Sequence, residues 1–333
     1  MLHRSQLVLI NQNSINAGVR MNFASRRFIE AGVSHLVIVL SLCFFSVAQA
    51  GTIVRISTTV GDYSIELLDD VAPVTVRNFL NYVTRGDYNR TYLHRVEDGF
   101  VVQGGAYRFQ PFVGPIDIRQ DAPIVNEFNV SNTRGTVAMA KFEGSPNSAT
   151  NQWFVNLTNN SSLDGTNGGF TVFGVVLGEG MLILDAIDAL PFVSLGVKAS
   201  SAPYITAAYE SPTAFVYQNA VVTSRFSSAP HVFESVTGKM ITSVNVNSGA
   251  ELISLHLNAV PHASQLILQA DVQSVISRRA TFDGIATYST TDNRLRIPAL
   301  EVNLNGAISV LKNVVFALSN RELLQFTLES FNQ

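Results

Sequence analysis

The most informative segment of the chain is Tyr92-Leu93-His94-Arg95, followed after two residues by Asp98-Gly99-Phe100-Val101-Val102-Gln103-Gly104-Gly105. It places an arginine and a glutamine beside apolar residues, and it contains no serine, threonine or cysteine that could act as a nucleophile. An arginine side chain keeps its charge and only donates hydrogen bonds. This combination favours a reaction that rotates a bond over a reaction that cleaves one.

Two later segments carry related patterns. The first runs from Gly135-Thr136-Val137-Ala138-Met139-Ala140-Lys141 through a loop to Gln152-Trp153-Phe154-Val155-Asn156. The second contains Leu163-Asp164-Gly165 and Phe170-Thr171-Val172-Phe173-Gly174. The order and spacing of all three segments resemble those of the cyclophilins, the prolyl cis/trans isomerases, and the resemblance covers roughly residues 51–226.

The resemblance implies a mainly β fold, in which a closed eight-stranded barrel is capped by two helices. It also implies peptidyl-prolyl cis/trans isomerase (rotamase) activity, no cofactor, and proline-containing polypeptides as clients. Without the resemblance, short apolar runs separated by loops rich in Asn, Ser and Gly predict only a β-rich α+β domain.

Three residues are candidates for catalysis: Arg95, Gln103 and Phe100. Rotation about an X-Pro bond is slow because amide conjugation raises a barrier near ~20 kcal/mol. Twisting the amide localises a lone pair on the prolyl nitrogen, and the guanidinium of Arg95 would stabilise that state more than the planar one. A surface ion pair of Arg95 with Glu97 or Asp98 is the alternative interpretation.

The resemblance also assigns substrate-binding residues. An apolar slot for the proline ring would be formed by Phe100, Val101, Phe154, Leu163 and Phe170. Gln103 would donate to a substrate carbonyl, and an extended peptide would be held by Gln152 and the backbone of Ala140 and Lys141. Core packing is the alternative for each apolar residue, and bracing of a loop is the alternative for either glutamine. His94 is expected to brace the loop rather than to transfer protons.

The chain departs from the family pattern at three positions. Ser162 stands where many cyclophilins have tryptophan, Phe170 where many have histidine, and Lys141 where asparagine is frequent. The change at Ser162 should affect binding of the bulky cyclic peptide inhibitors of the family more than turnover. These departures bear on substrate preference rather than on the reaction.

Periodicity predicts the elements of residues 51–226. Strands are expected over 53–57 and 63–67 around Gly61-Asp62, and later over 135–141, 152–157, 170–176 and 215–226. Pro73 should open a helix that ends at Gly86, and a second helix is expected over 181–190. Residues 191–212 are expected to form a long loop.

The sequence changes character after a short polar linker at residues 227–230. Beyond the linker, Ile253, Leu255 and Leu257 alternate with polar residues, which is the signal of a half-buried strand. Residues 231–333 are therefore predicted to form a smaller antiparallel β domain that could contact a partner or a surface. A non-enzymatic, cyclophilin-shaped chaperone or surface-binding module is the alternative to an enzyme.

The first fifty residues have the pattern of a secretory signal peptide. An uncharged apolar run over 36–47 follows Arg26 and Arg27, and Ala48-Gln49-Ala50 supplies small residues for cleavage after Ala50. A membrane anchor is the alternative, but this run is shorter than the ~20 residues that a spanning helix needs. Met21 is a possible true start. We therefore expect a periplasmic or secreted protein with no membrane contact after cleavage.

Composition excludes several functions for the chain after cleavage. Cleavage would remove Cys43, the only cysteine, together with four arginines and one glutamate, so the formal charge would change from −3 to −6. An acidic chain with four lysines does not suit nucleic-acid binding. The histidines His231, His256 and His262 lack metal-ligand spacing, so we expect solvated histidines and no metal site.

Overall fold

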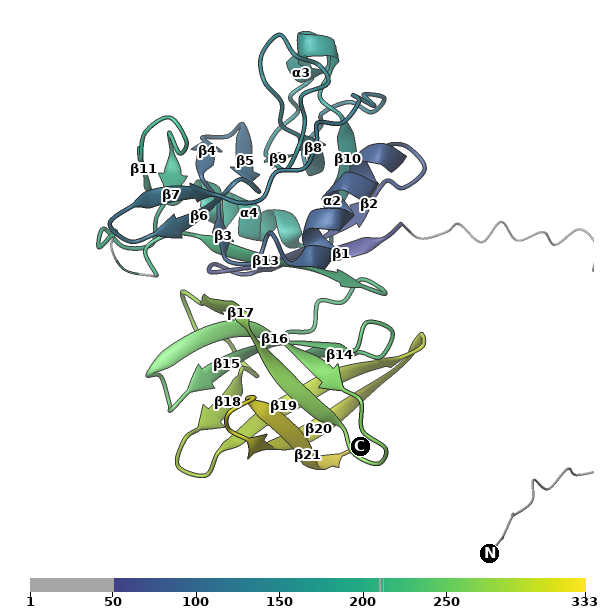
Figure 1. Ribbon diagram of the computed structural model, residues 1–333, viewed down its shortest axis with the longest axis vertical. Coiled ribbons are helices and arrows are strands. Elements are labelled where there is room, and N and C mark those ends of the chain that lie inside the picture. The colour runs from purple at the N-terminus through teal and green to yellow at the C-terminus, as the bar shows by residue number, and fades with distance from the viewer. Residues whose placement is uncertain (1–50, 210, 212) are drawn as a thin grey trace, which may run out of the picture. The chain divides into compact units, whose positions relative to one another are not determined.

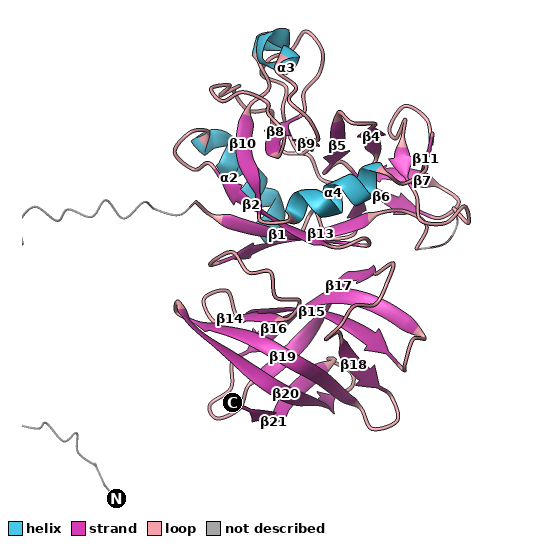
Figure 2. Ribbon diagram, turned by 180° about the vertical axis from the view of Figure 1, so that it is seen from behind, coloured by secondary structure: helices cyan, strands magenta, loops and turns pink. Residues whose placement is uncertain are grey.

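The computed structural model describes residues 51–209, 211 and 213–333, which Figure 1 colours from the N-terminal to the C-terminal end. The predicted signal peptide lies outside the described residues. Strands dominate and helices are few, as Figure 2 shows, so the prediction of a mainly β fold is confirmed. Within the described part of the chain, no helix is long and apolar enough to cross a membrane.

The first sheet contains eleven strands, all of which come from residues 53–223. In the order of hydrogen-bonded neighbours they are β4 (Arg95–Glu97), β5 (Val101–Gly104), β9 (Trp153–Asn156), β8 (Thr136–Met139), β10 (Val172–Leu177), β2 (Asp62–Leu67), β1 (Ile53–Thr58), β13 (Tyr217–Thr223), β3 (Thr91–Tyr92), β6 (Tyr107–Gln110) and β7 (Gly114–Asp117). Every strand that periodicity predicts in this part is present, with its ends shifted by a few residues.

One short segment of chain links two strands, β3 and β4, that are far apart in the order of the sheet. Residues 91–97 pair with β13 through β3 and with β5 through β4. Between these strands, His94 N–H donates to Gln103 O at 3.2 Å. The predicted count of eight strands is not confirmed, because the sheet has eleven strands and several of them are short.

Two helices pack against this sheet, as predicted. Helix α2 (Pro73–Arg85) begins at a proline, whose fixed φ suits the first helical position, and ends at Gly86, which adopts φ 73° in the left-handed region. Helix α4 (Gly180–Asp188) occupies the region expected at 181–190. A single-turn helix α3 (Ser162–Gly165) and the 3₁₀ turn η1 (Thr166–Gly168) were not predicted.

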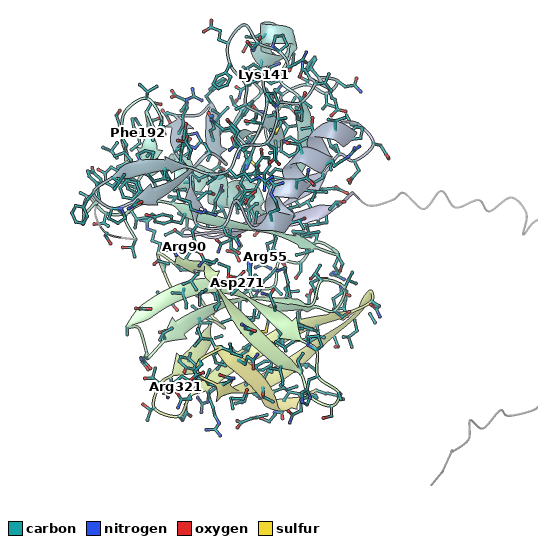
Figure 3. The ribbon with its side chains drawn as sticks, in the orientation of Figure 1. Arg55, Arg90, Lys141, Phe192, Asp271 and Arg321 are labelled. Carbon is teal, nitrogen blue, oxygen red and sulfur yellow. The ribbon has the colours of Figure 1, made fainter. Side chains whose placement is uncertain are left out.

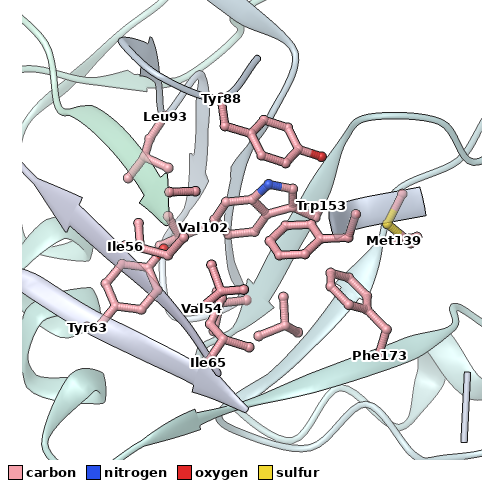
Figure 4. Close-up of a cluster of buried hydrophobic side chains, with 14 of the residues drawn as sticks. Val54, Ile56, Tyr63, Ile65, Tyr88, Leu93, Val102, Met139, Trp153 and Phe173 are labelled. Carbon is pink, nitrogen blue, oxygen red and sulfur yellow. The ribbon is translucent and has the colours of Figure 1, made fainter. Parts of the chain in front are cut away.

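The core of this part lies between the sheet and the helices. Figure 4 shows Val54, Ile56 and Ile65 from β1 and β2 facing Trp153 from β9. The ring of Phe79 on α2 meets Trp153 edge-on, with ring centroids 6.1 Å apart. These side chains are fully buried, so one face of these strands packs against the core.

Residues 191–203 are more ordered than the predicted loop. They contain β11 (Phe192–Val193) and β12 (Ala202–Pro203), which pair with each other. A small apolar cluster joins this segment to the main sheet and contains Tyr92, Phe215 and Ala199, with Tyr107, Phe109, Val193 and Leu195 packed against it. We call this set the third cluster, and it fixes the segment beside β6 and β7.

Residues 231–333, all of which the structure describes, form strands and no helix. The order of this second sheet is β14 (Val232–Glu234), β15 (Lys239–Val246), β16 (Glu251–Val260), β17 (Ile267–Ser277), β21 (Gln325–Asn332), β20 (Ala307–Asn320), β19 (Arg294–Leu304) and β18 (Ala286–Ser289). Because β14 also pairs with β19, seven of these strands close into a barrel. The predicted antiparallel pairing holds for most neighbours, but β14–β19 and β15–β18 are parallel.

Buried polar contacts connect residues before and after the linker. Asp62 accepts from Arg55 Nη2 and from Arg278 Nη1, each at 2.7 Å, and Figure 3 labels Arg55. Burial alone would raise the pKa of the Asp62 carboxyl, but the two guanidinium groups lower it. Arg279 N–H also donates to Thr59 O at 2.7 Å. The division into domains at residues 227–230 remains a prediction.

Candidate active site

A row of paired residues crosses five neighbouring strands of the first sheet. Arg95 on β4 pairs with Gln103 on β5, Gln103 pairs with Phe154 on β9, and Phe154 pairs with Ala138 on β8. Ala138 pairs in turn with Val172 on β10. Paired residues of antiparallel strands present their side chains on the same face of the sheet. The row therefore places the arginine, the glutamine and an apolar surface side by side.

The opposite face of the same strands belongs to the core. Val96, Val102, Val155 and Val137 alternate with the members of the row, and all four are buried in the core cluster. Successive residues of a strand point to opposite faces. Hence Arg95, Gln103 and Phe154 lie on the face of the sheet that is turned away from the core.

An apolar cluster covers much of this outer face. Val101, Ala138, Phe154 and Val172 are buried there, and the partly buried residues packed against them are Phe100, Leu163, Phe170, Ala140, Leu68 and Val130. The rings of Phe154 and Phe170 meet edge-on, with centroids 5.8 Å apart. The structure thus brings together all five residues of the predicted proline slot. Strand alternation could have indicated Ala138, which the sequence analysis missed.

The polar members of the row form a chain beside this cluster. Arg95 Nη1 donates to Gln103 Oε1 at 3.2 Å, and Gln103 Nε2 donates to Gln152 Oε1 at 2.8 Å. Arg95 Nε also lies 3.2 Å from Glu97 Oε1, so the ion pair considered from the sequence does form. The side chain of Arg95 keeps 33% of its surface exposed, which leaves the guanidinium accessible to a bound ligand.

His94 is buried next to this polar chain. Its ring packs edge-on against Tyr107, with centroids 4.9 Å apart. Burial lowers the pKa of His94 to about 4, so the imidazole is neutral near pH 7. A neutral, enclosed ring fits the predicted bracing role better than proton transfer.

Lys141 fixes the loop that carries Phe170. Its ammonium donates to Asn167 O at 2.8 Å and to Gly169 O at 2.5 Å, and it lies 4.9 Å from the centroid of the Phe170 ring. Asn167 adopts φ 52°, a left-handed conformation that non-glycine residues seldom adopt. The resemblance assigned only the backbone of Lys141 to the site, and the structure adds this role for the side chain. Ala140 N–H donates to Gln152 O at 2.9 Å, so of the two Ala140 backbone groups only the carbonyl remains for a peptide.

A chain of buried amides, which the sequence analysis missed, connects the aromatic residues of the cluster. Asn160 Nδ2 donates to Phe100 O at 2.9 Å and to Asn156 Oδ1 at 2.8 Å. Asn156 Nδ2 lies 3.2 Å from Asn132 Oδ1, and Asn132 Nδ2 donates to Phe170 O at 3.1 Å. Asparagine is usually exposed, whether in a loop or in a strand, so one sequence does not indicate that these three residues are buried.

The same chain of amides also holds helix α3. Asp164 Oδ1 accepts from Asn132 N–H at 2.9 Å and from Asn132 Nδ2 at 3.0 Å, while Ser131 Oγ donates to Asp164 Oδ2 at 2.5 Å. Leu163 precedes Asp164 on α3 and packs into the apolar cluster. The position of Leu163 therefore depends on the same buried amides as those of Phe100 and Phe170.

Two of the three C-terminal histidines are not the solvated side chains that the sequence predicted, whereas His262 is exposed as expected. His231 and His256 are both buried, and burial lowers their pKa values to about 4 and about 3. His231 Nδ1 lies 2.7 Å from Thr242 Oγ1, so it takes part in the packing of the barrel. In the described residues, no three His, Cys, Asp or Glu side chains gather as a metal site would require.

Comparison with known proteins points to one family. Residues 53–208 match the family described as cyclophilin type peptidyl-prolyl cis-trans isomerase/CLD. A crystal structure of a cyclophilin type peptidyl-prolyl cis-trans isomerase from Cryptosporidium parvum is similar over 53% of this chain and 99% of that chain, with a TM-score of 0.41 and 23% identity.

Sequence relatives are closer. A peptidyl-prolyl cis-trans isomerase of Acinetobacter baylyi is 38% identical over 154 residues, which make up 45% of this chain and 79% of that protein. Peptidyl-prolyl cis-trans isomerase B of Escherichia coli is 42% identical over 144 residues, which make up 41% of this chain and 84% of that protein. On these sequence matches, the chain belongs to the cyclophilin-type peptidyl-prolyl cis-trans isomerases.

Proposed function

We propose that this isomerase acts on Xaa-Pro bonds of exported polypeptides, with Arg95 as the group that stabilises the twisted amide. The observation that carries the proposal is the row Arg95–Gln103–Phe154, which sets a permanent cation next to an apolar surface on one face. A proline residue needs both features at once, because its ring is apolar and its amide nitrogen gains a lone pair on twisting.

The guanidinium of Arg95 would bind the twisted amide more strongly than the planar amide. The planar amide shares its nitrogen lone pair with the carbonyl, whereas the twisted amide does not. A positive group close to the nitrogen therefore lowers the energy of the twisted state more than that of either planar isomer. Arginine has five N–H donors, and Arg95 directs Nε toward Glu97 and Nη1 toward Gln103, so Nη2 can face the substrate.

The apolar cluster would take the proline ring. Phe154 and Val101 form its buried floor, and Phe100, Leu163 and Phe170 form its partly exposed wall. Burial of an aliphatic ring of this size is worth ~1.5–3 kcal/mol. It also removes water from beside Arg95, and an electrostatic interaction is stronger where water is excluded.

Gln103 and Gln152 would orient the peptide. Their amides are joined by one hydrogen bond, and Gln103 is held from the other side by Arg95. A fixed amide can donate to a substrate carbonyl without a large loss of side-chain entropy. Lys141 would act indirectly, because its ammonium holds the loop that positions Phe170.

The site of action is proposed to be the periplasm or the cell exterior. The apolar run and Ala48-Gln49-Ala50 support this proposal, and cleavage after Ala50 would leave Gly51 as the first residue. Residues 231–333 are proposed to contact a partner or a surface. N-terminal sequencing of periplasmic or extracellular protein tests the first point, and a chain that still carries Arg26 would overturn it.

The direct test of the activity uses NMR exchange spectroscopy on a peptide with one Xaa-Pro bond. The chain from Gly51 to Gln333 should accelerate cis/trans exchange at catalytic concentration, and Phe154→Ala should abolish most of this acceleration. An exchange rate equal to that of the free peptide would contradict the proposal. Circular dichroism of both proteins separates a lost activity from a lost fold.

A further inference from the structure

Two exposed apolar side chains project from the tip of the hairpin β6–β7. Phe112 is 91% exposed and Val113 is 62% exposed. The hairpin turn is closed by Val113 N–H, which donates to Gln110 O at 3.1 Å. Phe112 adopts φ 64°, a left-handed conformation that is costly for a bulky residue. Neither burial nor turn geometry explains an aromatic residue at this position, and unexplained strain of this kind is typical of functional sites.

A second exposed apolar pair lies on residues 191–203. Phe192 on β11 is 57% exposed, and Val197 is fully exposed. Figure 3 labels Phe192, and Figures 1 and 2 both show β11 beside β7. An ion pair between Lys198 and Asp117 connects this segment to the hairpin.

The hairpin and the second segment are both anchored in the third cluster. The third cluster contains Tyr107 and Phe109 from the hairpin together with Val193 and Leu195 from the second segment. The ammonium of Lys198 lies 5.6 Å from the centroid of the Tyr107 ring. The two elements are therefore packed together at their bases, and each of them presents one exposed apolar pair to solvent.

Both elements are also connected to the active site through their bases. Val96 N–H donates to Ser201 O at 2.9 Å, and Arg95 forms a parallel bridge with Ser201, so the second segment lies alongside the strand of Arg95. The hairpin begins four residues after Gln103, and its Tyr107 packs on His94. A chain bound at Arg95 would therefore leave the site close to these side chains.

We propose that Phe112, Val113, Phe192 and Val197 form a docking surface for apolar segments of an unfolded polypeptide whose proline is bound at Arg95. The proposal rests on the proposed function. Native proteins bury such segments and unfolded ones expose them, so the surface would select unfolded clients. The charges nearby, Lys198 and Asp117, neutralise each other, which suits a client segment without charge.

A second copy of this chain is a less suitable occupant. The four side chains together expose on the order of 500 Å², a size common for functional patches on monomers. A stable protein–protein interface buries ~800 Å² on each partner. An extended client segment needs less area, because the proline site holds it at the same time.

The test compares two substrates. The double variant Phe112→Asn/Val197→Ser removes apolar surface, and asparagine tolerates the left-handed conformation, so the fold should be kept. We expect kcat/KM on a short Xaa-Pro peptide to change less than twofold, and the catalysed refolding rate of a proline-limited unfolded protein to fall at least fivefold. The matched control is Val236→Ser/Phe331→Ser, which removes exposed apolar side chains from residues 231–333 and should leave both rates unchanged.

The outcomes are distinguishable. Normal peptide activity with unchanged refolding activity in the double variant would overturn the docking surface alone. A wild-type chain without peptide activity would overturn the proposed function, and the docking surface with it. Sedimentation velocity of wild type and variant adds the remaining outcome: a wild-type dimer that the variant converts to a monomer would identify a second copy as the occupant and overturn the proposal.

Discussion

Arg95 and Gln103 face each other across β4 and β5, and the Arg95 Nη1 atom lies 3.2 Å from Gln103 Oε1. The same glutamine donates to Gln152, so its amide is oriented from both ends. The relationship explains why the two residues can act together. In the proposed mechanism, the fixed guanidinium of Arg95 would face the prolyl nitrogen, and the fixed amide of Gln103 would donate to a substrate carbonyl.

Gln103→Met should lower kcat/KM on a Xaa-Pro peptide about tenfold, because the amide is lost while the side-chain length is kept. Loss of a hydrogen bond to a charged or substrate group costs ~1.5 kcal/mol, and each ~1.4 kcal/mol is a factor of ten in rate. The matched control is Gln325→Met on β21 of the second sheet, where the amide of Gln325 lies 3.5 Å from Gln269 Oε1. Equal rates for wild type and Gln103→Met would remove Gln103 from the catalytic group.

Lys141→Met should raise KM several-fold while kcat changes less, because the ammonium positions the Phe170 loop and does not touch the reacting bond. Two carbonyl contacts and one aromatic contact disappear in this variant. Steady-state kinetics with a peptide substrate separates the two constants. Lys312→Met serves as the control on the second sheet, and a loss of kcat with unchanged KM in Lys141→Met would contradict the positioning role.

Three buried histidines should make the fold sensitive to acid. Burial lowers the pKa values of His94 and His231 to about 4 and that of His256 to about 3, whereas an unfolded histidine has a pKa near ~6.5. Below pH 6.5 the unfolded state therefore binds more protons than the folded state, and stability falls as the pH falls toward 4. Each group contributes a slope of up to ~1.4 kcal/mol per pH unit.

Chemical denaturation at pH 7, 6 and 5 measures this slope. Without His256, the unfolded state should bind one proton fewer at low pH. The free energy of unfolding of His256→Gln should therefore depend less steeply on pH than that of the wild type. A free energy of unfolding that stays constant between pH 7 and pH 5 would contradict the burial of these rings.

Asp62→Asn should destabilise the chain by ~3–5 kcal/mol, because Arg55 and Arg278 would keep their buried charges without a counter-ion. The pKa of Asp62 is lowered, so its contribution is present above the unfolded value and is lost as the pH falls through the folded value. Urea unfolding of Asp62→Asn, Arg278→Met and the double variant measures the coupling. Additive effects would show that the two residues are not paired.

The parts of the fold that sequence predicts are local. Helix α2 is bounded by Pro73 and Gly86, whose backbone preferences are properties of single residues. The parallel pairing of β14 with β19 joins residues almost seventy positions apart, and no local pattern encodes such a pairing. For the same reason, no local pattern shows that residues 191–203 lie alongside the strand of Arg95.

Prediction of the site from sequence is limited in the same way. Phe100, Phe154 and Phe170 could be named from the resemblance, because the motifs contain them. The buried amides of Asn132, Asn156 and Asn160 could not be predicted, because one sequence does not distinguish an exposed asparagine from a buried one. Their burial becomes visible only when the strands and α3 enclose them.

The most direct test of the account is the activity of Arg95→Ala and Arg95→Lys on a short Xaa-Pro peptide. Loss of a charge-assisted interaction made mainly in the twisted state costs ~1.5–3 kcal/mol, so kcat/KM of Arg95→Ala should fall at least tenfold with an unchanged circular dichroism spectrum. Arg95→Lys should also be impaired, since an ammonium lacks the planar array of donors. Arg321→Ala, which removes an exposed arginine from the turn between β20 and β21, should match the wild type. An Arg95→Ala protein that is folded and fully active would contradict the central claim.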